Sequence, residues 1–327
     1  MKNNAIKNKI IKKNIIKKNV IKKKWVKGLF AILAGMFLLA KNAGLLSEQG
    51  TSASAITSST EMQVHFIDVG QGDSTLIISG EHAMLIDTGD DTKGTAVQNY
   101  MRKQGIKKLD YLILTHPDKD HIGGAPVVIT KFQIDKVFMS YFKKDTKIYN
   151  KVIQSLEEKR LNDEIPVVGE KYELGNAEFT IIAPNRSYEG TEDESNNSSI
   201  GILLQNGKNR FIFTGDAEKE AEQDIVKNKL AIAADVYQVG HHGSKTSSTK
   251  KFLNAVQPKF AVISCGKGNE NGQPHEKVLN NFRKKDIQVF RTDEQGSIVA
   301  TSDGENITWN CDPSTTWKSG ERLNHSE

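Results

Sequence analysis

Two histidines and two aspartates lie close together in the segment Thr115-His116-Pro117-Asp118-Lys119-Asp120-His121. The apolar run 109–114 precedes them and is typical of a buried strand. Imidazole and carboxylate groups that converge at a strand end must lose water, and a divalent cation such as zinc or manganese compensates for that loss. A solvated polar loop is the alternative, but Ile122-Gly123-Gly124 follow directly, and the two glycines allow a tight turn. The segment therefore predicts a metal-binding loop with His116, Asp118, Asp120 and His121 as ligands.

Four further motifs accompany this loop: Phe-Ile-Asp-Val-Gly-Gln-Gly-Asp at 66–73, Leu-Ile-Asp-Thr-Gly at 85–89, Phe-Thr-Gly-Asp at 213–216 and Val-Gly-His-His-Gly-Ser at 239–244. With these five motifs in this order, the chain resembles the metallo-β-lactamase-fold hydrolases. Within that group it resembles the ComEC-like hydrolase domain of the competence proteins that take up DNA. The resemblance extends over residues 62–300 and implies an α/β (α+β) fold, a four-layer αββα sandwich.

The resemblance also implies roles outside the loop. Asp87 would orient the metal loop without binding metal, and Asp216 would bridge two metals; a turn-forming aspartate and a helix N-cap are the respective alternatives. His241 and His242 follow an apparent strand, 236–239, and successive side chains near a strand end diverge. We therefore expect one of them, His241, to bind metal and His242 to pack or to contact substrate.

The chain departs from the superfamily pattern at two places. Asp118 stands where a second loop histidine is usual, and the segment 194–199 contains no histidine where a further one would fall. One metal site would then comprise His116, Asp118 and Asp216, whose oxygen atoms shift the preference from zinc toward manganese. The other site would comprise Asp120, His121, His241 and the bridging Asp216. The sequence leaves open whether one or two ions bind.

The expected chemistry follows from such a centre. A divalent cation lowers the pKa of a bound water to about 7 and so supplies a hydroxide nucleophile, which Asp120 would orient or deprotonate. Ser244, Lys245 and Ser247 precede a helix and could hold a substrate phosphate, although an ordinary N-cap cluster has the same composition. His275, at an apparent helix start, would be a neutral ring that binds metal or phosphate, or else a surface histidine.

Short apolar strands alternate with helical patterns through the rest of the chain, and by themselves predict only an α/β or α+β fold. We expect helices at 94–104, 147–159, 217–229, 248–256 and 275–285. We expect strands at 62–69, 74–79, 83–87, 110–115, 134–139, 178–183, 199–205, 210–214, 235–239, 259–264, 287–291 and 297–302. The hydrolase domain should occupy residues 62–311, followed by a polar tail at 312–327.

The N-terminal part has the composition of an export segment. Eleven lysines and no acidic residue lie in 1–27, which should stay in the cytoplasm, and the apolar run 28–40, extendable to 46, suits a signal-peptide core or a signal anchor. Residues 47–61, rich in Ser, Thr and Ala, read as a linker. We therefore expect an extracellular domain that is either secreted or tethered to the membrane.

The charge distribution limits the class of partner. Of the 45 lysines and arginines, 11 lie in residues 1–27, so the rest of the chain carries 34 basic and 40 acidic residues, a net charge of −6. A general nucleic-acid-binding surface is therefore not indicated, and a phosphate substrate must be held by metal and by local positive groups. Cys265 and Cys311 could form a disulfide in an exported domain, or remain thiols.

These observations predict an exported metal-dependent hydrolase that cleaves a phosphodiester, with DNA or an oligonucleotide as first substrate. A cell-wall phosphoesterase, such as one that removes phosphorylcholine from teichoic acid, is the second hypothesis, because the net charge of −6 does not favour a long polyanion. A non-catalytic, metal-stabilised binding module is the third.

Overall fold

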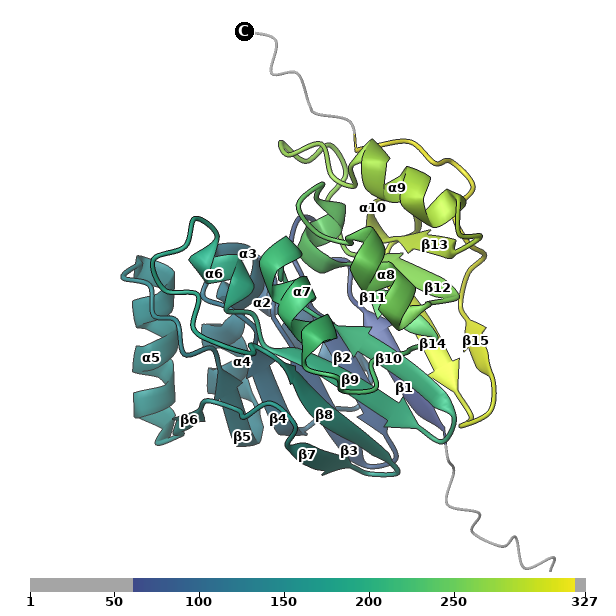
Figure 1. Cartoon of the computed structure of the whole chain (residues 1–327). Coiled ribbons are helices and arrows are strands. Elements are labelled where there is room, and N and C mark those ends of the chain that lie inside the picture. Colours follow the sequence, from purple (N-terminus) through teal and green to yellow (C-terminus); the bar gives the residue numbers. More distant parts are fainter. Residues whose placement is uncertain (1–60, 321–327) are drawn as a thin grey trace, which may run out of the picture. The chain divides into compact units, whose positions relative to one another are not determined.

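The computed structural model describes residues 61–320, which form two β-sheets with helices on their outer faces (Figure 1). The expected lysine-rich segment and apolar run, and the linker apart from its last residue, lie outside the described residues. None of the helices within 61–320 has the length and apolar character needed to cross a bilayer.

The first sheet has the strand order β15-β14-β1-β2-β3-β4-β5-β6, and the second has the order β13-β12-β11-β10-β9-β8-β7. The strands of the first sheet are β1 Met62–Phe66, β2 Thr75–Ser79, β3 His82–Ile86, β4 Lys108–Leu114, β5 Gln133–Met139, β6 Asp163–Glu164, β14 Ile298–Ser302 and β15 Ile307–Trp309. Those of the second are β7 Lys171–Leu174, β8 Ala177–Ala183, β9 Gly201–Asn206, β10 Asn209–Phe213, β11 Val236–Gln238, β12 Phe260–Ile263 and β13 Gln288–Arg291.

The helices are α2 Gly94–Lys103, α3 Lys119–Ile122, α4 Ala125–Lys131, α5 Lys147–Lys159, α6 Glu194–Asn197, α7 Lys219–Lys227, the 3₁₀ turn η1 Gly240–Gly243, α8 Lys250–Val256, α9 Glu276–Arg283 and α10 Thr292–Gln295. Most helices connect strands of the same sheet, whereas α10 lies between β13 of the second sheet and β14 of the first. In each sheet one half is antiparallel and the other parallel, with β3 to β6 parallel in the first and β10 to β13 parallel in the second.

Three apolar clusters separate the layers. The first lies between the sheets, where the rings of Phe66 from β1 and Phe213 from β10 stack with centroids 6.3 Å apart. The second packs α2, α4 and α5 on the outer face of the first sheet, and the third packs α7, α8 and α9 on the second sheet. The arrangement is therefore the mixed α/β sandwich of two sheets that the resemblance implied.

Most long elements match the expected ranges within two or three residues, and α5 covers the expected range 147–159. The helix α4 was not expected, because Val127-Val128-Ile129-Thr130 is a β-branched run typical of strands. Pro126 in its first turn, where no amide hydrogen bond is lost, starts the helix instead.

Residues 312–320, which we expected to belong to a polar tail, lie along the domain. The amide of Ser314 donates to Val289 O at 2.7 Å and that of Gly320 donates to Pro274 O at 3.1 Å. Arg291 also donates from Nη1 to the carbonyl of Lys318. The described domain therefore continues to residue 320.

Candidate metal centre

The polar loops that the sequence singled out follow the carboxyl ends of four strands. Asp87 follows β3, the segment 115–121 follows β4, Asp216 follows β10, and η1 follows β11. β3 and β4 are parallel neighbours in one sheet, and β10 and β11 are parallel neighbours in the other. Parallel strands end at the same sheet edge, so each sheet delivers two polar loops to one edge.

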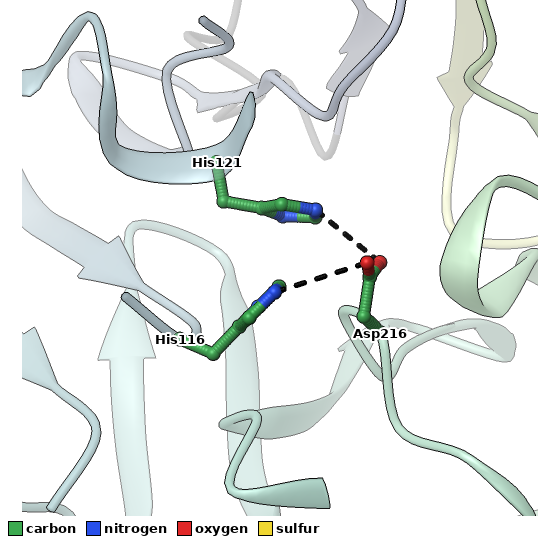
Figure 2. A group of neighbouring side chains, drawn as sticks. All are labelled: His116, His121 and Asp216. Atoms are coloured by element: carbon green, nitrogen blue, oxygen red, sulfur yellow. Dashed lines mark ion pairs between the residues drawn. The ribbon is translucent and has the colours of Figure 1, made fainter. Parts of the chain in front are cut away.

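The innermost group joins the two sheets through a carboxylate. His116 Nε2 lies 3.8 Å from Asp216 Oδ2, and His121 Nε2 lies 3.3 Å from Asp216 Oδ1. Figure 2 shows both rings directed at this carboxylate from different sides. All three residues are buried.

Each of these imidazoles is fixed through its other nitrogen. His121 Nδ1 donates to Asp87 Oδ2 at 2.8 Å, and Asp87 also accepts from the amide and the hydroxyl of Thr115 at 2.8 and 2.7 Å. His116 Nδ1 lies 3.1 Å from Thr115 Oγ1 and 3.3 Å from Ser199 Oγ. A carboxylate that orients a histidine through Nδ1 leaves Nε2 as a free lone pair, which is the form that binds metals.

The atoms that face one another in this cluster have no other partner. Among residues 61–320, the Nε2 atoms of His116, His121 and His242 and Oδ1 of Asp216 are buried without a hydrogen bond. Buried polar atoms without partners are rare, and several that converge indicate a bound cation. The donor set fits a divalent metal, since His116, His121 and Asp216 form one group of ligand atoms within 4.8 Å, and Asp120, His121 and His242 form another.

The two adjacent histidines take positions opposite to those we expected. His242 is buried, with Nε2 at 3.6 Å from Asp216 Oδ2 and 3.3 Å from Asp120 Oδ2, and its Nδ1 donates to Ser264 O at 3.0 Å. His241 Nε2 is 3.8 Å from Asp216, but its Nδ1 lies 3.0 Å from Glu218 Oε1 and the ring is partly exposed. The geometry therefore makes His242 the stronger candidate ligand. Both residues have positive φ angles, 50° and 53°, so the alternation assumed for a strand end does not apply.

Asp118 is engaged away from the cluster. Its Oδ1 accepts from Lys144 Nζ at 2.8 Å and from Ser195 Oγ at 2.6 Å. Burial raises the pKa of Asp118, but His116, Lys144 and Ser195 together lower it. Asp118 belongs to none of the candidate metal groups among residues 61–320, whereas Asp120, two positions later, does. Neither Lys144 nor Ser195 is close to Asp118 in sequence, so this pairing had no local signal.

The structure adds one carboxylate that had no predicted role. Asp73 belongs to two of the candidate groups, one with Asp87 and His121 and one with Asp216 and His242. Its Oδ2 accepts from Gln238 Nε2 at 2.8 Å, and its Oδ1 is buried without a hydrogen bond. Asp73 is the last residue of the motif 66–73, so the sequence did contain a motif that could have indicated its role.

The carboxylates of the cluster attract positive charge, which protons on the imidazoles or a metal cation can supply. Burial lowers the pKa of His121, but the carboxylates of Asp216 and Asp87 raise it well above its usual value. Burial raises the pKa of Asp216, but His121, His242 and His241 hold it well below its usual range. Asp216 is therefore ionised, and protons or a divalent cation among the imidazoles satisfy its charge.

Asp216 does not cap a helix, because α7 begins later, at Lys219, with Glu218 as the N-cap residue.

The glycines after the metal loop also differ from expectation. Gly123 and Gly124 have ordinary helical φ angles of −60° and −79°. A Cβ on Gly124 would lie 2.4 Å from Thr88 O, so the loop needs glycine for close backbone approach and not for a tight turn.

The expected phosphate-binding residues lie beside the cluster in two groups. Ser244, Lys245 and His275 line a pocket of about 260 Å³ together with His241 and Gln273. His275 is the N-cap residue of α9, where its Nδ1 accepts from the amide of Lys277 at 3.2 Å. Ser247 is buried outside this pocket and its hydroxyl donates to Ala217 O at 2.9 Å, so that proton is not offered to a ligand.

Both cysteines are free thiols, with Cys265 buried and Cys311 half-buried. They pack in different apolar clusters, Cys265 outside the second sheet and Cys311 between the sheets. The possible disulfide is therefore not formed.

Comparison with known proteins gives the family. The profile described as the metallo-beta-lactamase superfamily matches residues 67–267. The chain belongs to this superfamily. Membership supports a metal-dependent hydrolase and divalent-metal binding at the described cluster. The match covers β3, β4, β10 and β11, the four strands that carry the candidate centre.

Two curated proteins confirm the resemblance to competence proteins. ComE operon protein 3 of Bacillus subtilis is 36% identical over 265 residues, which are 73% of this chain and 33% of that protein. Recombination protein 2 of Haemophilus influenzae is 32% identical over 241 residues, 72% of this chain and 28% of that protein. The chain thus spans about a third of the length of these relatives. The solved metallo-beta-lactamase-fold protein YhfI of Bacillus subtilis is 12% identical, with a TM-score of 0.48 over 74% of this chain and 99% of that chain.

Proposed function

We propose that this chain is a metal-dependent phosphodiesterase that hydrolyses DNA or an oligonucleotide. The observation that carries the proposal is the set of convergent buried atoms without partners, His116 Nε2, His121 Nε2, His242 Nε2 and Asp216 Oδ1. A closed structural site would keep every ligand buried, but here the side chain of Asp120 is 33% exposed. The cluster therefore has a side open to a substrate.

The roles of the residues follow from their positions. A divalent cation, when bound, supplies a hydroxide nucleophile near neutral pH and stabilises charge on the leaving oxygen. His116, His121 and Asp216 would hold it, with zinc or manganese as candidates and one or two ions possible. Asp120, at the exposed edge, would orient the attacking water or accept its proton. Lys245 and His275 would bind the substrate phosphate in the adjoining pocket.

The substrate class is supported by relatives and by local charge. A competence protein of Neisseria gonorrhoeae, ComA, is 30% identical over 73% of this chain, which makes DNA the first substrate to test. With a net charge of −6 beyond residue 27, the domain repels polyanions at long range, so affinity must come from the metal centre and nearby lysines.

Replacing Asp120 tests the proposal. Asp120→Asn keeps the size of the side chain, which is 33% exposed and lies 3.3 Å from His242 Nε2. We expect hydrolysis of bis(p-nitrophenyl) phosphate and of a labelled oligonucleotide to fall by about 10³-fold, the scale of a lost general base, with nearly unchanged thermal unfolding. The Asp120→Asn variant should be less active than the unsubstituted protein both with manganese and, in a separate assay, with zinc.

The control is Asp135→Asn, which changes the same charge on the surface of β5, where Asp135 pairs with Lys108. Undiminished turnover in Asp120→Asn would refute the assigned role. Release of phosphorylcholine from a choline phosphoester, with DNA intact, would favour the cell-wall phosphoesterase. No turnover of either substrate by metal-loaded protein would favour the binding module.

We further propose that the N-terminal lysines stay in the cytoplasm and that the domain is extracellular, secreted or held at the membrane. The composition of residues 1–46 supports this location. Protease added to intact cells should digest the chain beyond residue 61. Digestion only after lysis would contradict export.

A further inference from the structure

A second pocket adjoins the one beside the metal centre. It has a volume of about 330 Å³, and its lining includes the four lysines Lys219, Lys245, Lys250 and Lys277. Lys245 lines both pockets, so the second one continues the first away from the cluster. The lysines come from the start of α7, the loop after η1, the start of α8 and the first turn of α9.

The positive charge of this pocket is not neutralised locally. All four lysines are exposed, and within residues 61–320 none of their ammonium groups forms an ion pair. Three neighbouring acidic side chains bond to other groups: Glu220 pairs with Arg186, Glu276 accepts from Asn280, and Glu222 accepts from the amides of Ser248 and Thr249. Surface lysines elsewhere do pair, as Lys136 does with Glu164 at 2.9 Å. An unpaired group of four in an acidic domain indicates an anionic ligand.

The pocket has an ordered floor. Ser247 and Ser248 are buried, and the carboxylate of Glu222 accepts from the amides of Ser248 and Thr249 at 2.5 and 2.8 Å. The amide of Lys219 donates to Thr246 O at 3.1 Å, which ties the start of α7 to the loop. The amide of His275 donates to Gly243 O at 2.8 Å, which ties the start of α9 to η1. Hydrogen bonds therefore connect the backbone segments that carry the four lysines.

We propose that the two pockets form one track for successive phosphates of a single nucleic-acid strand. The first pocket takes the scissile phosphodiester beside the metal centre, and the lysine-lined pocket takes the next phosphate of the same strand. The substrate class is then an oligonucleotide with several phosphodiesters, not an isolated diester. The inference rests on the proposed phosphodiesterase function, and it adds Lys219, Lys250 and Lys277 to the residues that contact substrate.

The residues that line the pockets also predict whether the site discriminates between bases. No Phe, Tyr or Trp lines either pocket, so stacking platforms for bases are missing from the described track. Contacts to phosphate carry no sequence information. We therefore expect oligothymidylate and oligoadenylate of equal length to be bound and cleaved alike.

The kinetic test compares substrates of different length in the full chain. Lys250→Gln/Lys277→Gln should raise KM for the hexanucleotide (dT)6 by about tenfold and flatten its salt dependence by about 1.4 units of slope, as expected for two lost phosphate contacts on a single strand. The factor for d(TpT), which has a single phosphodiester, should be at least threefold smaller. The matched control is Lys107→Gln/Lys131→Gln, which removes the same charge from a pocket beside α2 and α4. An equal rise in KM for (dT)6 and for d(TpT) would overturn the track. So would an equal rise in KM for (dT)6 in the two double variants.

A second readout does not need turnover. Hydrogen exchange in full-length Asp120→Asn protein should show protection of residues 245–250 and 276–281 on addition of (dT)6, and the protection should be lost with Lys250→Gln/Lys277→Gln. Protection confined to residues 116–121 would refute the track while leaving the phosphodiesterase intact. Stronger protection by a poly(glycerol phosphate) oligomer than by (dT)6 would overturn the assignment to nucleic acid. No protection with either would refute the track, and if the unsubstituted protein also fails to hydrolyse DNA, the phosphodiesterase is refuted as well.

Discussion

The two sides of the metal centre are built in different ways. On the first sheet, His121 is fixed by Asp87, a buried carboxylate that also accepts two hydrogen bonds from Thr115. On the second sheet, His241 and His242 are aimed by a 3₁₀ turn in which both residues have positive φ, and the chain continues into a loop that exposes Lys245. The first side is a rigid support for metal ligands, whereas the second combines a ligand with substrate contacts. Substitutions on the first side should therefore lower metal affinity. On the second side, some substitutions should lower metal affinity and others should weaken substrate binding.

The first expected effect is a loss of metal affinity in Asp87→Asn. The change weakens the acceptor for His121 Nδ1 and the bonds to Thr115, so the imidazole loses its orientation. Loss of such an orienting carboxylate lowers metal affinity by about 10–100-fold. Competition with a fluorescent chelator measures this for zinc and manganese.

A surface pair of the same chemistry is the control for that variant. Asp110 lies 3.1 Å from His82 Nδ1 outside the centre, so Asp110→Asn should leave metal affinity unchanged. Unchanged affinity in Asp87→Asn would show that the first side does not depend on this carboxylate, and the contrast between the two sides would fail.

A second test distinguishes the two adjacent histidines. His242→Ala removes a candidate ligand atom and should lower metal affinity by at least about tenfold, since even the loss of an outer-shell partner costs about 10–100-fold. His241→Ala should change affinity by less than about threefold and act mainly on KM, since His241 lines the pocket with Lys245. The reverse order would restore His241 as the ligand and His242 as the packing residue.

The smallest expected effect concerns the loop below the lysines. Burial raises the pKa of Glu222 to about 7, although its hydrogen bonds with Ser248 and Thr249 lower it. Because the folded state holds this proton more tightly than the unfolded state, stability should fall as pH rises toward 7. Between pH 6 and 7 the expected loss is about 1 kcal/mol.

Glu222→Gln should remove that slope, measured by urea unfolding at pH 6 and pH 7 with a chelator present. Glu220→Gln, an exposed neighbour on α7, is the matched control and should keep the wild-type slope. An identical slope in Glu222→Gln would assign the pH dependence to other groups.

The sequence by itself determined the strand ends and the residue types that gather there. The apolar run before His116, the run before Asp216 and the amphipathic pattern of 147–159 are local signals, and β4, β10 and α5 follow them. The family resemblance then predicted two sheets with Asp87 and Asp216 beside the loop. These features follow from short-range periodicity and from motifs that are contiguous in the chain.

Only the tertiary structure decided which polar side chains face one another. Asp118 turns to Lys144 and Ser195, which lie 26 and 77 residues away in sequence. His242 and not His241 is buried in the cluster, and the positive φ angles of both residues in η1 mean that the alternation of a strand end does not apply. The lysine-lined pocket combines residues from α7, α8 and α9 that no local pattern connects. Side-chain direction depends on backbone dihedrals and on partners distant in sequence, and neither is encoded in the spacing of a motif.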